Sequence, residues 1–154
     1  IHYCSNFLLS FINNVLDYSK LEEGKMSLHY QIFNIRYILN EIIRVMGKKL
    51  EEKNIQMILN ISENIPEILY GDDMKISQIL MNIIGNAVKF TESGYVKISV
   101  NIKSLHNNKY NLEFIIEDTG IGISKENLCN LFECYNQLDG NITNKYGGTG
   151  LGLY

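Results

Sequence analysis

The segment from Asp72 to about Phe90 restricts the fold of this chain more than any other stretch of sequence. Asp72 or Asp73 can cap the start of a helix here. The loop before it contains Pro66, the only proline, and leads to Gly71. Apolar residues cover most of the circumference of this predicted helix: Ile79, Leu80, Ile83, Ile84, Ala87 and Val88. A helix with so wide an apolar surface must be largely buried, so it needs other elements packed around it.

The rest of the chain alternates between helix-like and strand-like periodicity. Apolar residues at i, i+3 and i+4 predict helices over Ile1–Glu22 and Ile35–Glu52, and Gly24 is a suitable stop for the first. Alternation of apolar and polar residues predicts four strands: Met26–Phe33, Ile55–Ile61, Tyr95–Ile102 and Tyr110–Glu117. A turn-rich segment, His106–Lys109, separates the last two. The pattern predicts an α+β fold, a two-layer α/β sandwich with helices on one face of a mixed sheet, preceded by one amphipathic helix.

Composition limits the classes of protein to which the chain can belong. Its 154 residues suffice for one domain with a sizeable core, and 45% hydrophobic and 20% charged residues are ordinary for a soluble protein. The net charge of −3 gives no bulk electrostatic reason to bind nucleic acid or an anionic membrane. Three cysteines without CxxC spacing, Cys4, Cys129 and Cys134, predict free thiols in a reducing compartment. We therefore expect a cytoplasmic domain, and any membrane anchor would lie outside this sequence.

Three polar residues interrupt the apolar surface of the predicted helix over residues 73–90. Asn82, Asn86 and Lys89 are spaced at i, i+4 and i+7, so they share one face. Each buried polar group without a partner costs about 1–3 kcal/mol, so these side chains need partners. Neighbouring backbone is one possible partner, and a ligand rich in oxygen and negative charge is the other.

Two glycine-containing segments are further candidates for ligand binding. Asp118-Thr-Gly120-Ile-Gly122 directly follows a predicted strand, where glycine permits tight turns and close approach and Asp118 can accept a hydrogen bond from an amine. The second segment, Gly147–Gly152, could offer backbone N–H groups to phosphate. No Gly-Lys-Ser/Thr follows it and no strand precedes it, so it is neither a Walker A loop nor a dinucleotide fingerprint. Each segment alone is a weak signal.

In this order and spacing, the segments resemble the ATP-binding domain of sensor histidine kinases, a GHKL-type domain shared with DNA gyrase and mismatch-repair ATPases. "QILMNIIGNAVKFTESGYV" resembles the N box, "DTGIGIS" the first glycine box, "LFECYNQLD" the F box and "GGTGLGL" the second glycine box. "FLLSFINNVLDYSKLEEGKMSL" is similar to the second helix of the dimerisation and phosphotransfer domain. The resemblance implies a Bergerat-type ATP-binding fold over residues 25–154, cut at the second glycine box, after the end of that helix in residues 1–24. The segment "GNAVKFTESGYV" most resembles the hybrid subgroup of these kinases.

The resemblance also implies roles for individual residues. Asn86 would ligate a Mg²⁺ ion that bridges the ATP phosphates, Lys89 would face the phosphates, and Asp118 would accept a hydrogen bond from the adenine amino group. Asn82, Asn86 and Lys89 form the implied catalytic set. The other implied nucleotide-binding positions are Phe90, Gly120, Gly122, Phe132, Lys145, Gly148, Thr149, Gly150, Leu151 and Gly152.

The identity of residue 82 indicates whether the domain transfers the phosphoryl group of ATP or hydrolyses ATP. The hydrolytic relatives carry a glutamate at this position, and an amide cannot act as a general base, so phosphoryl transfer to a protein histidine is favoured over attack by water. None of His2, His29 and His106 begins the His-Glu/Asp-hydrophobic-Arg motif of the phospho-acceptor, so that histidine is expected outside this chain.

The implied function is that of a protein-histidine kinase domain that uses ATP and Mg²⁺. The parent would dimerise through the N-terminal helix and transfer phosphate to a response-regulator receiver domain. The fragment alone is expected to be inactive and to bind ATP weakly. A non-catalytic ATP-binding or dimerisation module is the alternative, and an ATPase that drives conformational change is a third possibility that Asn82 disfavours.

Overall fold

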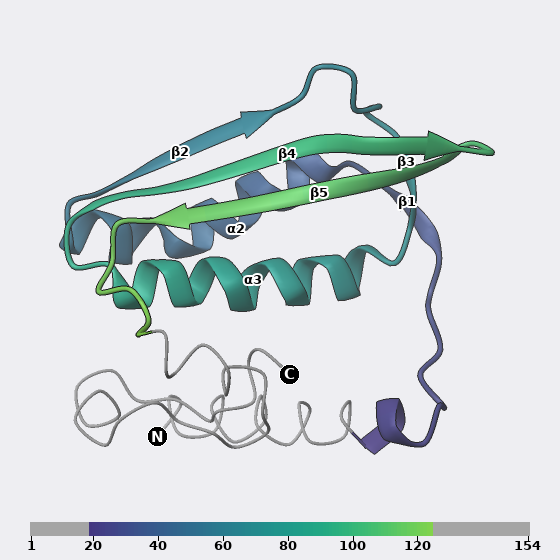
Figure 1. Cartoon of the computed structure of the whole chain (residues 1–154), viewed down its shortest axis with the longest axis horizontal. Coiled ribbons are helices and arrows are strands. Elements are labelled where there is room, and N and C mark those ends of the chain that lie inside the picture. The colour runs from purple at the N-terminus through teal and green to yellow at the C-terminus, as the bar shows by residue number, and fades with distance from the viewer. Residues whose placement is uncertain (1–18, 125–154) are drawn as a thin grey trace. The chain divides into compact units, whose positions relative to one another are not determined.

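A computed structural model describes residues 19–124 of the chain, and Figure 1 shows them in colour. Residues 19–22 form the end of a helix, so most of the predicted helix Ile1–Glu22 lies outside the described residues. The helix stops as predicted at Gly24, whose φ is 63°. Its N–H donates to Leu21 O at 3.0 Å, and Lys25 N–H donates to Lys20 O at 2.9 Å, the pattern of a Schellman motif. A separate compact unit begins at Tyr30.

Two long helices of this unit match the predictions from periodicity. Helix α2 spans Ile35–Glu52, and the side chain of Asn34 caps it by accepting from Arg36 N at 2.9 Å. Helix α3 spans Asp73–Phe90, and its cap is Asp72, whose Oδ1 accepts from Lys75 N at 2.9 Å. Within residues 19–124, neither these helices nor any other is both long and apolar enough to cross a membrane.

Among residues 19–124, the main sheet has three strands in the order β2 (Ile55–Ile61), β4 (Gly94–His106) and β5 (Lys109–Asp118). Strand β2 pairs with β4 in parallel, and β4 pairs with β5 in antiparallel orientation. The predicted turn between β4 and β5 is confirmed, because Asn107 and Asn108 adopt φ values of 49° and 60°, as a two-residue type I′ hairpin requires. The sheet is therefore mixed, as predicted.

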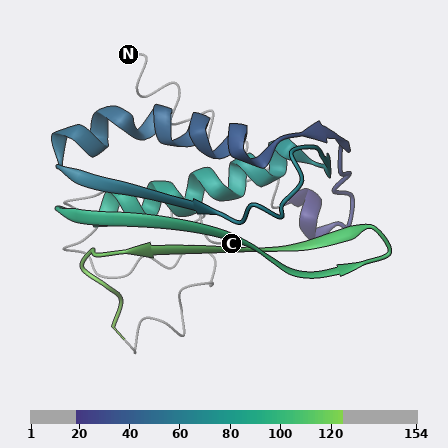
Figure 2. The ribbon, with the colours of Figure 1, turned by 90° about the horizontal axis from the view of Figure 1, so that it is seen from above.

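The two helices run side by side along one face of this sheet (Figures 1 and 2). Alternate residues of β4, namely Val96, Ile98 and Val100, are fully buried in the core shared with the helices. The intervening side chains lie on the opposite face, where Lys97 Nζ forms an ion pair with Glu117 Oε2 at 2.7 Å. The helices supply the other half of the core through Ile35, Ile38, Leu39, Ile42, Met46, Leu50, Leu80, Ile84, Ala87 and Val88. This arrangement confirms the two-layer α/β sandwich.

A second, two-stranded sheet differs from the prediction. Strand β1 spans only Gln31–Phe33, rather than Met26–Phe33, and pairs with β3 (Leu69–Gly71), a segment predicted to be part of a loop. Both strands run directly into the cap residue of a helix, so only three residue pairs can form. The predicted strand residues before Gln31, His29 among them, lie outside regular structure.

Candidate functional site

The polar face of α3 exists as the sequence predicted. Asn82, Asn86 and Lys89 lie at i, i+4 and i+7 of one regular helix, and all three are half-buried. In the part of the chain that the structure describes, neither asparagine side chain has a hydrogen-bond partner. The interpretation that these two amides pair with neighbouring backbone is therefore wrong for residues 19–124. Two half-buried amides on one face are available to a ligand.

Lys89 lies at the last turn of α3 in surroundings that disfavour its charge. Burial, and next the positive charge of Lys49, lower the pKa of Lys89 below its ordinary value. Its Nζ lies 4.8 Å from the centroid of the Phe90 ring, a cation–π distance. An anion bound beside Lys89 would offset both unfavourable effects, because it supplies the opposite charge.

Asp118 is the last residue of β5 and starts the loop that contains Gly120 and Gly122. Its Oδ1 accepts a hydrogen bond from Gly120 N at 2.9 Å, so the side chain forms an Asx-type turn with its own loop. Asp118 is exposed, and within residues 19–124 its Oδ2 has no hydrogen-bond partner. One carboxylate oxygen thus shapes the loop, and the other is free to accept from a ligand.

The Asp118 loop contacts the end of α3 directly. Ile121 N donates to the Phe90 carbonyl oxygen at 3.3 Å. A Cβ added at Gly120 would lie 2.6 Å from that same oxygen, so only glycine permits the contact. From the sequence, Gly120 was predicted to allow a ligand to approach the backbone closely. The structure shows that Gly120 also allows the loop to approach the backbone of Phe90. Residues 89–90 and 118–121 therefore form one junction, although the sequence separates them by a whole hairpin.

Thr119, which the sequence analysis did not single out, fixes the other side of this loop. Its hydroxyl accepts from Tyr95 N at 3.0 Å and lies 3.3 Å from the carbonyl oxygens of Ser93 and Tyr95. Gly94 adopts φ of 111°, and a Cβ there would collide with the Thr119 hydroxyl. The loop is therefore attached to the start of β4 as well as to α3.

Comparison with known proteins agrees with this geometry. The profile of the family described as "Histidine kinase-, DNA gyrase B-, and HSP90-like ATPase" matches residues 71–154, more than half of the chain. The chain belongs to this family. The match begins one residue before the cap of α3 and includes Asn82, Asn86, Lys89 and the Asp118 loop.

Two similar proteins are named histidine kinases. The chain is 44% identical to hybrid signal transduction histidine kinase K of Dictyostelium discoideum, over 98% of this chain and 13% of that protein. It is 42% identical to signal transduction histidine-protein kinase BarA of Escherichia coli K12, over 97% of this chain and 16% of that protein. The chain thus spans less than a fifth of the length of either relative.

A solved structure of similar fold is full-length ShkA in complex with AMPPNP. It matches with a TM-score of 0.77 and 30% identity, over 98% of this chain and 30% of that chain. The agreement confirms the predicted ATPase-family fold for this histidine kinase-like chain.

Several predicted site residues lie outside the described residues. They are Phe132, Lys145, Gly148, Thr149, Gly150, Leu151 and Gly152. Their roles stay predictions, as do the thiol state of the three cysteines and the dimerisation role of the N-terminal helix.

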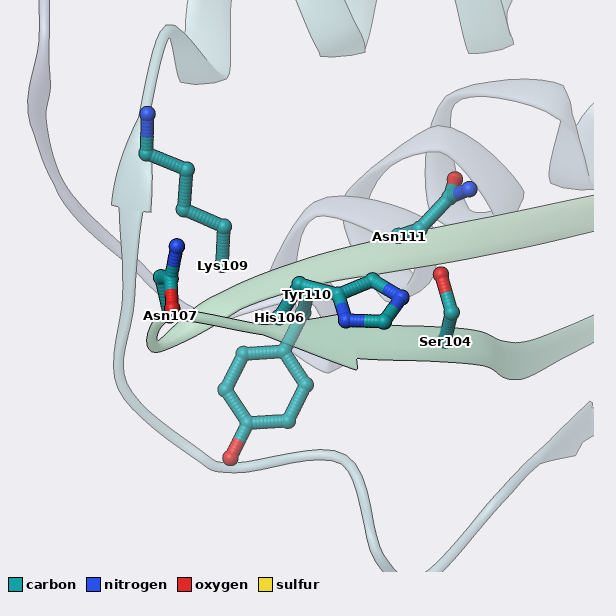
Figure 3. Close-up of a pocket in the computed structure, with 6 residues that line it drawn as sticks. All are labelled: Ser104, His106, Asn107, Lys109, Tyr110 and Asn111. Atoms are coloured by element: carbon teal, nitrogen blue, oxygen red, sulfur yellow. The ribbon is translucent and has the colours of Figure 1, made fainter.

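Two hollows on the described surface are lined by residues other than those of this site. One of about 530 Å³ lies at the β4–β5 hairpin end, lined by Ser104, His106, Asn107, Lys109, Tyr110 and Asn111 (Figure 3). It lies at the opposite end of β5 from Asp118. Within residues 19–124, no group of three or more His, Cys, Asp or Glu side chains is placed to hold a metal ion. Within the described residues, the candidate site consists of the end of α3 and the Asp118 loop.

Proposed function

We propose that this chain is the ATP-binding catalytic domain of a histidine kinase, and that it positions Mg-ATP for phosphoryl transfer to a histidine outside this sequence. The family match and the names of the relatives support an ATP-binding kinase domain. The observation that carries the proposal is the junction in which Ile121 N binds Phe90 O. It holds the residues predicted to bind phosphate and the residue predicted to bind adenine in one place.

Asp118 is proposed to accept a hydrogen bond from the exocyclic amino group of adenine. Support comes from its free Oδ2, its exposure and the fixed geometry of its loop. A hydrogen bond to a charged acceptor contributes about 1.5–3 kcal/mol. Guanine presents a carbonyl oxygen at the corresponding position, so the carboxylate would favour ATP over GTP.

Asn86 and Lys89 are proposed to hold the phosphate end of the nucleotide. The amide oxygen of Asn86 is a hard ligand suited to Mg²⁺, and phosphate oxygens and water would complete an octahedron. Bound Mg²⁺ would neutralise phosphate charge and orient the terminal phosphoryl group. The lowered pKa of Lys89 fits this role, because a polyanion relieves the cost of a half-buried charge near Lys49.

Asn82 favours transfer over hydrolysis. Its amide cannot take a proton from water, so positioning and charge neutralisation remain the main contributions of the domain. As further proposals, the domain lies on the cytoplasmic side and its parent forms a homodimer through the N-terminal helix. Donation of phosphate to a receiver domain is also proposed, and the hybrid relatives support it. A non-catalytic ATP-binding or dimerisation module remains the alternative function.

Asp118→Asn tests the adenine contact, with Glu117→Gln as its matched control. Asparagine keeps an oxygen that can accept from Gly120 N, but its NH₂ group cannot accept from adenine. Glu117 is the preceding residue of β5, pairs with Lys97 on the opposite face of the sheet, and loses the same charge in the control. We expect the Kd of Mg-ATP to rise at least about tenfold in Asp118→Asn only. The preference for ATP over GTP should fall at the same time. Unchanged ATP affinity in Asp118→Asn would show that the pocket is assigned wrongly.

Asn86→Ala separates the kinase from the binding module. The chain, joined to a histidine-bearing dimerisation domain, is supplied with labelled ATP and Mg²⁺, and acid-labile phosphate on histidine is measured. We expect transfer by the wild type and none by Asn86→Ala, while both remain folded by circular dichroism. Nucleotide binding without transfer by the wild type would favour the non-catalytic module.

A further inference from the structure

Lys53 connects the end of α2 to the end of α3. It is the C-cap residue of α2, and its Nζ lies 2.8 Å from each of three carbonyl oxygens, those of Val88, Lys89 and Thr91. The last carbonyls of a helix have no partner inside it and carry the negative end of its dipole. Lys53 therefore satisfies two of these helix carbonyls, and the one just beyond the helix, with a positive charge.

An ammonium group has three N–H donors, and all three of Lys53 are used. This distinguishes Lys53 from a lysine that binds phosphate, which must keep a donor for its ligand. Lys53 is also half-buried, so the three carbonyl oxygens replace much of the water that would otherwise surround its charge. The geometry thus describes a structural attachment between the ends of two helices.

The segment that Lys53 holds is the one that carries the candidate site. Lys89 contributes both its side chain to the proposed phosphate site and its carbonyl to Lys53. The next carbonyl, that of Phe90, accepts from Ile121 N in the Asp118 loop. Two neighbouring peptide groups therefore contact two different elements, α2 through Lys53 and the Asp118 loop through Ile121.

We propose that Lys53 is a positioning residue for the nucleotide site. It fixes the last turn of α3 and, through the carbonyl of Phe90, the distance between Lys89 and Asp118. The identification of the ligand as a nucleotide rests on the proposed function, whereas the contact between Lys53 and α3 does not. No sequence pattern indicates this role, because all three hydrogen-bond acceptors of Lys53 are backbone atoms.

Lys53→Met removes the donors and keeps an unbranched side chain. The control is Ile35→Val, a truncation at a fully buried position in the first turn of α2, at the far end of the helix from Lys53. Two quantities are measured in protein that circular dichroism shows to be folded. One is the Kd of Mg-ATP by titration, and the other is the exchange rate of the Ile121 amide hydrogen by NMR.

We expect Lys53→Met to raise the Kd about tenfold and to accelerate Ile121 exchange by a similar factor, with neither change in Ile35→Val. Lys53→Arg keeps the charge but spreads its donors over a planar fork, so its values should fall between those of wild type and Lys53→Met. If Lys53→Met does not fold, the Kd of Mg-ATP and the Ile121 exchange rate are measured in Lys53→Arg instead.

The outcomes separate this inference from the proposed function. Unchanged Kd or unchanged Ile121 exchange in Lys53→Met overturns the positioning role, and so do equal changes in Ile35→Val. A wild-type chain that binds no Mg-ATP contradicts the proposed function instead. In that case Ile121 exchange alone decides whether Lys53 fixes the Asp118 loop, with acceleration supporting that role and no acceleration overturning it.

Discussion

Gly120→Ala tests whether the site depends on close contact between the Asp118 loop and α3. The added Cβ would lie 2.6 Å from the Phe90 carbonyl oxygen, 3.0 Å from its carbonyl carbon and 2.8 Å from Asp118 Oδ1. Real Cβ atoms essentially never approach other heavy atoms more closely than 3.0 Å. Two of these three neighbours are backbone atoms, which cannot rotate away, so the loop must move off the helix by a few tenths of an ångström.

The cost follows from the contacts that this movement breaks. The hydrogen bond from Ile121 N to Phe90 O is already 3.3 Å long, so a small shift breaks it. Loss of one such bond costs about 0.5–1.5 kcal/mol, and residual overlap costs about 1–3 kcal/mol. We therefore expect the free energy of unfolding to fall by about 1.5–4.5 kcal/mol. The Kd of Mg-ATP should rise about tenfold or more, because Asp118 moves with the loop.

Gly47→Ala is the matched control for this substitution. Gly47 lies within α2, and a Cβ there would meet no heavy atom within 4 Å. Alanine at such a helical position should raise stability by about 0.5–1 kcal/mol and leave nucleotide affinity unchanged. Urea unfolding followed by circular dichroism measures stability, and titration with Mg-ATP measures affinity. If Gly120→Ala gave the stability and affinity of the wild type, the contact between the loop and α3 would be refuted.

Three further substitutions test separate parts of the same region. Because burial and Lys49 lower the pKa of Lys89, the folded state binds fewer protons than the unfolded state, and stability should rise with pH toward about 10. Lys89→Met should abolish that rise in urea unfolding at a series of pH values; an identical slope would contradict it. Thr91→Val should leave the free energy of unfolding unchanged or raise it by about 1 kcal/mol, since the buried Thr91 hydroxyl has no hydrogen-bond partner among the described residues. Thr119→Val should lower it by about 1 kcal/mol, through loss of the hydroxyl that binds Tyr95 N at 3.0 Å. Thermal unfolding checks both threonine variants, and a change of opposite sign in either would refute its premise.

Elements that depend on local patterns were predicted well. The bounds of α2, α3 and β2 agree with the predictions, because periodicity and cap residues are local properties of the sequence. The shared face of Asn82, Asn86 and Lys89 followed from helical geometry alone. That the two amides have no partner among the described residues did not follow, since it depends on which neighbouring atoms surround them.

Features that depend on distant contacts were missed. Strand β3 has three residues and exists because it pairs with β1, which lies more than thirty residues earlier in the chain. The need for glycine at position 120 was attributed to close approach of a ligand, although the atom nearest to an added side chain there is the carbonyl oxygen of Phe90. Lys53 was not singled out, because lysine is common on helix ends and its partners are backbone oxygens. Every residue has a backbone carbonyl, so a contact with a backbone oxygen does not require a particular residue type and cannot be predicted from the pattern of side chains.

The junction at the end of α3 explains how a site with unfavourable groups can remain in place. Half-buried amides that have no partner among residues 19–124, and a lysine with a lowered pKa, reduce the stability of the free domain. Such groups relax toward water or toward each other unless the surrounding backbone is fixed. Here Lys53 fixes the last turn of α3, Ile121 binds the carbonyl of Phe90, and Thr119 anchors the loop to β4. These attachments join α3 to α2 and to the Asp118 loop, and the loop to β4. A charged, oxygen-rich ligand that bound only the folded domain would add to its stability.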